Sequence, residues 1–249
     1  MMIKTNHSLS VDCVLFGYDG TALKVMLVDR TYSKDGGFFN DRKLPGRMIF
    51  DNESLSVSAR KVAREMLGTA DFNLTQLYIF SNPDRVTAEE LKWINEHHGI
   101  HTDRVVTVAY YGVVKLNESL LKHTTREGVH WVEVDTITHL AMDHKEILSM
   151  ALSALNRELL ETPIAFDLLS RRFTIRQLQD LYSAILGIEI DNRNFRKQIL
   201  VSGIIKGTGE KEVNVAHKPA EFYTFDRKAY ERLHKKDRVE FRFIKRWQY

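Results

Sequence analysis

One stretch, residues 172–200, constrains the fold of this 249-residue chain more than any other. Its apolar side chains recur every three or four positions, which predicts an amphipathic helix that begins after Thr174 and ends at Gly187. A second helix is expected to follow directly, with Asp191 or Asn192 as its N-terminal cap. The stretch therefore predicts two helices joined by a tight turn.

The second helix has one apolar face and one polar leading edge. Its spacing predicts that Phe195 and Ile199, which share a face, are buried. The polar edge supplies the candidate DNA contacts Arg193, Asn194, Arg196 and Lys197. A turn followed by such a helix fits the major groove of DNA, while a small helical bundle with solvated charges fits the same pattern.

Two strand-like runs follow the helix pair, at residues 203–207 and 221–225. Between them lies a polar segment, residues 208–220, which contains Lys211 and Lys218. The order helix, helix, strand, long hairpin and strand is that of a winged helix, and the two lysines are the candidate DNA contacts of its wing.

Charge is distributed unevenly along the chain. Residues 161–249 carry 18 lysines and arginines against 12 acidic residues, whereas residues 1–160 carry 18 against 21. This balance indicates that only the second part meets a polyanion, although a solvated surface gives the same counts. Because Thr162–Pro163 ends a long helical pattern, we place the boundary between two domains there, at 1–160 and 161–249.

The chain has the composition of a globular protein of the cytoplasm. It contains no apolar run long enough to cross a membrane and no secretory signal, so we expect no membrane partner. The single cysteine, Cys13, lies in an apolar strand-like run and is expected to be buried rather than nucleophilic.

The first part alternates strand-like and helical patterns. Asp19–Gly20 is a hairpin signal, and the polar, glycine-rich residues 30–42 are expected to form a loop. The elements expected in this part are strands at 10–16, 23–29, 74–81, 105–115 and 128–134 and helices at 54–67, 87–98 and 143–160.

Residues 44–68, LPGRMIFDNESLSVSARKVAREMLG, resemble the metal-binding box of Nudix domains. In that box, glutamates on one helix face hold a divalent cation on a pyrophosphate, and the cation activates water. Glu53, Glu65 and Gly68 match the box. The resemblance therefore identifies Glu53 and Glu65 as relic carboxylates.

Four positions depart from the box. Arg47 stands in place of its first glycine, Lys61–Val62 in place of an Arg–Glu pair, and Met66 in place of the second of two adjacent glutamates. Two of the three helix carboxylates are thus apolar here. We expect no catalytic residue, no bound metal and no cofactor, and we interpret the helix as retained for the fold.

The resemblance extends over nearly the whole chain, to the Nudix-related transcriptional regulators of the NrtR and AraR type. The segments FTIRQLQ, ILG and RNFRK carry it most specifically. It implies an α+β protein: a Nudix-like α/β/α sandwich with a mixed sheet, followed by a C-terminal winged helix-turn-helix domain. It also implies a homodimer that binds double-stranded operator DNA, responds to a sugar, a sugar derivative or ADP-ribose, and lacks hydrolysis. Residues 86–102 form an insertion relative to this family and are expected to contain a helix.

The candidate effector contacts are Arg30, Arg47, Arg104 and Tyr110. A guanidinium at residue 47 can face an anionic or hydroxyl-rich ligand, and a solvated surface arginine is the alternative. We favour a sugar or sugar derivative over ADP-ribose, because the metal ligands that suit a pyrophosphate are missing.

Several features remain open. His97, His98 and His101 are more consistent with a solvated helix end than with metal ligands, and Asp143–His144 with a helix start than with an acid–base pair. The basic segment 227–246 suits either DNA phosphate or a dimer partner. Against the regulator hypothesis stand a Nudix pyrophosphohydrolase acting on ADP-ribose or a nucleotide sugar, and a protein-interaction scaffold. The sequence does not distinguish a repressor from an activator.

Overall fold

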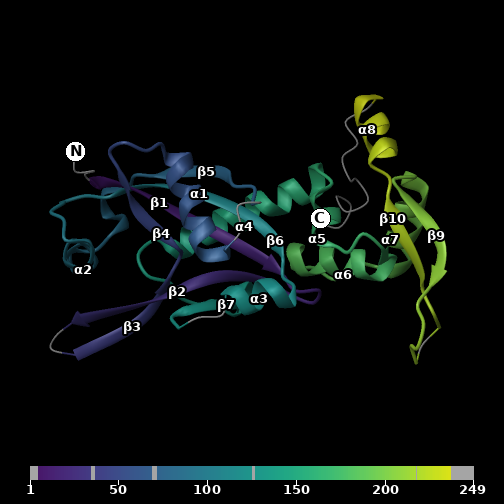
Figure 1. The fold of residues 1–249 in the computed structure, drawn as a ribbon, viewed down its shortest axis with the longest axis horizontal. Helices are drawn as coiled ribbons and strands as arrows, with labels where there is room; N and C mark the ends of the chain where they lie inside the picture. Colours follow the sequence, from purple (N-terminus) through teal and green to yellow (C-terminus); the bar gives the residue numbers. More distant parts are fainter. Residues whose placement is uncertain (1–4, 35–36, 69–71, 125–126, 217, 237–249) are drawn as a thin grey trace. The chain divides into compact units, whose positions relative to one another are not determined.

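The structure is a computed structural model that describes residues 5–34, 37–68, 72–124, 127–216 and 218–236 (Figure 1). The chain divides into two units, one of Met1–Gly17 with Leu23–Ala154 and one of Tyr18–Ala22 with Leu155–Tyr249. The division falls inside a helix, just before the position chosen from the sequence. The functional domain boundary near residue 160 therefore stays a prediction.

The first unit is built on a seven-stranded sheet. Its main path has the order β3-β2-β1-β6-β5, while β4 pairs with β1 and β7 pairs with β2. The strands are β1 (Thr5–Tyr18), β2 (Leu23–Lys34), β3 (Gly37–Lys43), β4 (Gly46–Phe50), β5 (Thr75–Phe80), β6 (Val106–Lys115) and β7 (Val129–Glu133). At the predicted turn after β1, the Asp19 carboxylate accepts hydrogen bonds from the backbone N–H groups of Thr21 and Ala22, both at 2.9 Å. Gly20 has a φ of 100°, a conformation that glycine adopts without strain.

The loop predicted for residues 30–42 is wrong, because this segment forms a long β2–β3 hairpin. Arg30 pairs with Asp41 and Thr31 with Asn40 in the antiparallel register. Polar side chains join both pairs, since Arg30 donates to the Asp41 carboxylate and the Thr31 hydroxyl donates to Asn40. Cross-strand polar pairs stabilise a hairpin without the apolar alternation that marks a strand in a sequence.

Four helices belong wholly or partly to the first unit: α1 (Leu55–Leu67), α2 (Ala88–His98), α3 (Glu118–Thr124) and α4 (His144–Glu161). Short 3₁₀ turns occur at Pro83–Arg85 and Val134–Thr136. The predicted helix at 54–67 is confirmed: the Ser54 side chain caps α1, and Gly68 ends it in the left-handed conformation. α1 buries Ala59, Val62 and Leu67 against the core of the sheet. The helix expected in the insertion is confirmed as α2, whereas β4 and α3 were not predicted.

The second unit contains the predicted winged helix, with α6 (Ile175–Leu186), α7 (Asn192–Ser202), β9 (Ile205–Lys211) and β10 (Glu221–Phe225). A two-residue strand, β8 (Phe173–Thr174), completes a three-stranded sheet of order β8-β10-β9. The strand predicted at 203–207 begins later and extends further than expected, so that β9 and β10 form a long hairpin (Figure 1). Two helices that were not predicted, α5 (Ile164–Leu168) and α8 (Arg227–Lys236), flank these elements in the sequence.

The ends of α6 follow the sequence signals closely. Thr174 and Gln177 form a reciprocal capping box, and Gly187 ends the helix with a φ of 66°. These are the strongest local helix signals within residues 172–200. Among the described helices, none is both long and apolar enough to cross a membrane.

Candidate functional site

The orientation of α7 is set by its cap and by its buried face. The Asp191 carboxylate accepts the backbone N–H of Asn194 at 2.7 Å, which selects Asp191 over Asn192 as the cap. Phe195 is 2% exposed, and its ring lies 5.8 Å from that of Tyr182 on α6. With this face fixed against α6, the opposite face of α7 points to solvent.

The predicted DNA contacts all lie on that exposed face or beside it. Arg193, Asn194, Arg196 and Lys197 are all exposed. Arg196 differs from the other three because its guanidinium forms a hydrogen bond with the phenol of Tyr223 in β10. The first turn of α7 contains no acidic residue. A cationic and amide-bearing first turn is suited to base edges and phosphates, since the N-terminal residues of a recognition helix contact them.

The wing places its two predicted lysines on either side of the hairpin connection. Lys211 ends β9 and Lys218 precedes β10, and both are exposed. Two hydrogen bonds hold the arms together between them: the Glu212 N–H donates to the Ala220 carbonyl at 2.9 Å, and the Glu212 carboxylate accepts the Ala220 N–H at 3.1 Å. One backbone–backbone bond and one bond to a side-chain carboxylate thus close the wing, and both lysines lie at its surface.

In the first unit, the relic Nudix box is neutralised by its own side chains. The Glu53 carboxylate accepts hydrogen bonds from Arg47 at 3.0 Å, from Lys61 at 2.6 Å and from the Phe50 N–H at 3.2 Å. Burial alone would raise the pKa of Glu53. The hydrogen bonds from Lys61 and Phe50 and the charges of Arg47 and Lys61 outweigh burial and hold this pKa below its usual value. Glu53 therefore carries a negative charge that is already balanced.

Arg47 also reaches the second relic carboxylate. Its Nη1 lies 3.9 Å from Glu65, and its guanidinium stacks over the Phe50 ring at 4.5 Å from the ring centre. A guanidinium thus lies between the two carboxylates that remain from the box. The two residues that replace carboxylates of the box serve the core: Val62 is buried in it, and Met66 packs against it. Across the described residues, no group of three or more potential protein ligands is arranged to hold a metal ion.

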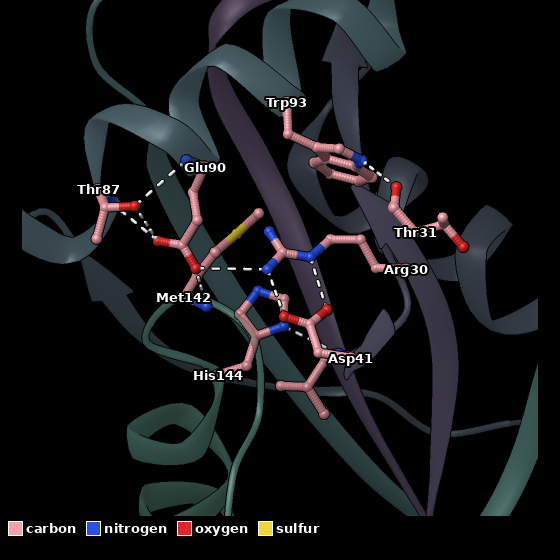
Figure 2. Close-up of polar contacts among 9 residues, drawn as sticks. Arg30, Thr31, Asp41, Thr87, Glu90, Trp93, Met142 and His144 are labelled. Atoms are coloured by element: carbon pink, nitrogen blue, oxygen red, sulfur yellow. Dashed lines mark hydrogen bonds and ion pairs between the residues drawn. The ribbon is translucent and has the colours of Figure 1, made fainter. Parts of the chain in front are cut away.

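The structure does not bring the four predicted effector contacts together. Arg30 is 3% exposed and forms two hydrogen bonds with Asp41, at 2.8 and 2.5 Å, with Glu90 of α2 3.6 Å away (Figure 2). Tyr110 is buried in the core and donates to Gln76 at 3.2 Å. Arg104 is exposed and donates to the Ser81 carbonyl. Both side chains are buried, and the Arg30 guanidinium lies 5.2 Å from the ring centre of Trp93. Their role as effector contacts stays a prediction.

Arg47 is the member of that set that lines a pocket. This pocket is narrow, with a cavity volume of about 40 Å³, and it lies between β1, β4 and the helix α2. Asp12, Lys43 and Arg47 bring charges to it, and Trp93 and His98 bring rings. Sequence reasoning missed Asp12, although a carboxylate within the apolar run SVDCVLF was a usable signal.

A buried polar network forms the back of the pocket. Arg85 donates to both carboxylate oxygens of Asp143, at 2.8 and 2.6 Å. The Leu44 N–H donates to Nδ1 of His144 at 2.9 Å, which leaves Nε2 facing the Asp12 carboxylate at 3.7 Å. Burial lowers the pKa of His144; Asp12 opposes that shift and Lys43 adds to it. His144 is therefore neutral, and the pair Asp143–His144 ties the start of α4 to the sheet rather than forming an acid–base pair.

The remaining open features are partly placed. His97 stacks on Trp93 with ring centres 4.6 Å apart, and the His101 carbonyl lies 3.2 Å from Nδ1 of His7. The first part of the basic segment 227–246 forms α8, whose Tyr230 packs on Phe225 with ring centres 5.9 Å apart. Residues 237–246 lie outside the described residues.

Comparison with known proteins gives two independent likenesses. Residues 165–225 match the family described as the NrtR DNA-binding winged helix domain. The ADPR responsive transcriptional repressor NtrR of Acinetobacter baylyi is 25% identical over 223 residues, which cover 87% of this chain and 81% of that protein.

Solved structures agree with both halves of the architecture. Shewanella oneidensis NrtR complexed with a 27mer DNA has a TM-score of 0.65 and 25% identity, covering 90% of this chain and 95% of that chain. A MutT/nudix family protein from Enterococcus faecalis has a TM-score of 0.57 and 25% identity, covering 88% of this chain and 87% of that chain. The fold is therefore a Nudix-like domain with a mixed sheet followed by a winged helix, as the sequence predicted.

Proposed function

We propose that this chain, a Nudix-related protein of the NrtR type, is a transcriptional repressor that binds operator DNA and responds to ADP-ribose. The observation that carries the proposal is the exposed surface of the first two turns of α7, where Arg193, Asn194 and Lys197 project from a helix fixed against α6. The name of the Acinetobacter relative supports both the repressor role and the effector, and the DNA complex of the Shewanella protein supports the partner.

The DNA contacts divide into two kinds by their chemistry. Arg193 and Asn194 have the side chains that form bidentate bonds with guanine and adenine, each worth roughly 1–3 kcal/mol of discrimination between bases. Lys197, Lys211 and Lys218 are suited to phosphate, a contact that ignores sequence and weakens with salt. We propose that a homodimer places two such helices on an inverted repeat, with half-sites about one helical turn or a multiple of it apart.

Selection of bound duplexes from the DNA upstream of the neighbouring genes, followed by gel shifts, tests this proposal. Arg193→Ala and Asn194→Ala should lose discrimination between operator and scrambled duplex, whereas Lys197→Ala should weaken both alike and reduce the salt dependence. The exposed Arg176→Ala on α6 serves as the control for charge alone. Operator binding by all three α7 variants at the parent's affinity would remove α7 as the recognition helix and make α8 the next candidate.

For the effector we now propose ADP-ribose rather than a simple sugar. The missing metal ligands argued against a pyrophosphate, but the name of the Acinetobacter relative gives ADP-ribose as its effector, and the Arg47 guanidinium lines the pocket in this chain. ADP-ribose is what remains of NAD when nicotinamide is removed, so we propose target genes of NAD-related metabolism and an action in the cytoplasm.

Calorimetry with ADP-ribose tests the effector. Arg47→Ala should weaken ADP-ribose binding and leave operator affinity without effector unchanged, while Arg104→Ala, an exposed arginine outside the pocket, should change neither. Equal losses of effector and operator binding by Arg47→Ala would show that Arg47 only supports the fold.

A further inference from the structure

A chain of three hydrogen-bonded side chains joins α7 to the strand that follows the wing. The Arg196 guanidinium of α7 donates to the phenol oxygen of Tyr223, in the middle of β10. The same phenol donates to Oε2 of Glu221, the first residue of β10, at 3.1 Å. These three residues form a brace between α7 and the β9–β10 hairpin.

The centre of the brace is enclosed. Tyr223 is 5% exposed, whereas Arg196 lies at the surface of α7. Burial raises the pKa of the Tyr223 phenol, and the hydrogen bond and charge of Glu221 add to that shift, while Arg196 opposes it. The phenol therefore keeps its proton at neutral pH, so that it can donate to Glu221 and accept from Arg196 at once. A hydroxyl used in both directions couples its two partners.

The neighbouring strand leaves room for the carboxylate of the brace. Gly207 of β9 pairs with Tyr223 in the antiparallel register. A Cβ at Gly207 would lie 2.4 Å from Oε1 of Glu221, a distance too short for two atoms that are not bonded. Glycine at residue 207 thus allows the Glu221 carboxylate to lie against the hairpin, within reach of the phenol.

The two elements joined by the brace have different demands on their position. A bidentate contact between a side chain and a base edge depends on geometry, whereas a flexible lysine reaches a phosphate from many positions. α7 is held against α6 through its apolar face, and the brace attaches it to the hairpin that carries Lys211 and Lys218. Elements that are fixed to one another before DNA binds lose less conformational freedom on binding.

We propose that Arg196 is a positioning residue in operator recognition rather than a DNA contact: through Tyr223 and Glu221 it holds α7 and the wing in the relative position in which both reach the operator. This role replaces the one predicted for Arg196 from the sequence. The inference rests on the proposed function, because it assigns a part in operator recognition to a contact within the second unit.

Gel shifts with operator and scrambled duplexes at several salt concentrations test this role. Tyr223→Phe removes the shared hydroxyl and keeps the ring, so it should lower the ratio of operator affinity to scrambled affinity by roughly tenfold, the size of one hydrogen bond to a charged group. Arg196→Ala should give the same loss, and the double variant should lose no more, because both changes break one chain. Gly207→Ala should also lower the ratio, since its methyl group displaces the Glu221 carboxylate.

Two variants of the same unit are matched controls. Tyr230→Phe removes a phenol that is 8% exposed in α8, and Arg176→Ala removes an exposed guanidinium from α6. Both should keep the parent's ratio of affinities. A thermal melt of each variant establishes that the ratio is measured on folded protein, and a brace that serves stability alone would lower the melting temperature and leave the ratio unchanged.

The salt dependence separates the brace from a phosphate contact. If Arg196 contacted phosphate, Arg196→Ala would reduce the salt dependence by about one phosphate contact while Tyr223→Phe bound as the parent does, and that result would overturn the inference. Discrimination at the parent's level by both Tyr223→Phe and Gly207→Ala would overturn it as well, with the proposed function intact. If the parent itself binds no duplex selectively, the proposed function fails and the inference falls with it.

Discussion

Val62→Glu restores a carboxylate that the Nudix box would carry, and we expect it to destabilise the first unit rather than rebuild a metal site. Val62 is 3% exposed and belongs to the apolar core cluster that includes Cys13, Ala63 and Val108. A glutamate at this position loses its hydration among apolar neighbours, and no carboxylate cluster exists in the described residues to share a metal ion with it.

The magnitude follows from two losses. Burial of a valine side chain stabilises a fold by roughly 1.5–3 kcal/mol, which the exchange removes. Leaving a buried acceptor unsatisfied costs about 1–3 kcal/mol more, and a charged one at least that. The sum of about 2.5–6 kcal/mol is a large part of the roughly 5–15 kcal/mol that stabilises a typical protein. At about 2–4 °C for each kcal/mol, the melting temperature of the first unit should fall by roughly 5–24 °C.

Differential scanning calorimetry measures this fall, with Val57→Glu as the matched control. Val57 lies on the same helix but is 38% exposed. There a glutamate three residues after Ser54 completes a capping box, so the control should unfold at or slightly above the parent's temperature. The carboxyl introduced by Val62→Glu should have a folded-state pKa above its unfolded value, so the deficit should be smallest at acid pH and grow as the pH rises through the unfolded value toward that folded pKa. Equal melting temperatures for the two variants, or stabilisation of Val62→Glu by Mg²⁺, would refute the argument.

Three further predictions follow from the structure. Because burial lowers the pKa of His144 below 6.5, the unfolded chain binds the proton more readily, and stability contributed by neutral His144 is lost as the pH falls below about 6.5. Chemical denaturation at pH 7 and pH 5 should show a smaller loss for His144→Gln than for the parent or for the exposed control His139→Gln. Chromatography should detect no Mg²⁺-dependent cleavage of ADP-ribose, and robust release of AMP would restore the hydrolase hypothesis. Thr174→Ala should cost the second unit about 1 kcal/mol in urea unfolding, because the capping box at α6 is lost; an unchanged midpoint would mean the cap contributes nothing.

The winged helix was predictable because its signals are local. Thr174 and Gly187 define α6, and Asp191 begins α7, all within one short stretch of sequence. Each of these capping residues satisfies backbone groups of its own helix, so the ends of α6 and the start of α7 do not depend on residues far along the chain. What the stretch did not reveal was β8, since a two-residue strand exists only through its pairing with β10.

The pocket that Arg47 lines was not predictable in the same way. Arg30 and Arg47 were both predicted to contact the effector. In the structure Arg30 forms an ion pair with Asp41, whereas Arg47 lines a pocket. The difference depends on the β2–β3 register, which the polar sequence of that hairpin conceals. Asp12 and Trp93 meet at the pocket from segments far apart in the chain, and only the folded sheet and the insertion bring them together.

The proposed function, binding of ADP-ribose without hydrolysis, is consistent with the charges of the relic box. Glu53 and Glu65 are negative, and Arg47 and Lys61 lie beside them as two positive groups that belong to the chain. A box with its full set of carboxylates repels a pyrophosphate until a divalent cation arrives, whereas here the cations are permanent. A guanidinium binds phosphate but does not generate hydroxide from water as a metal does. We therefore expect ADP-ribose to bind equally well with excess EDTA and with Mg²⁺ in calorimetry. A tenfold loss of affinity in EDTA that Mg²⁺ restores would show that a metal ion still takes part.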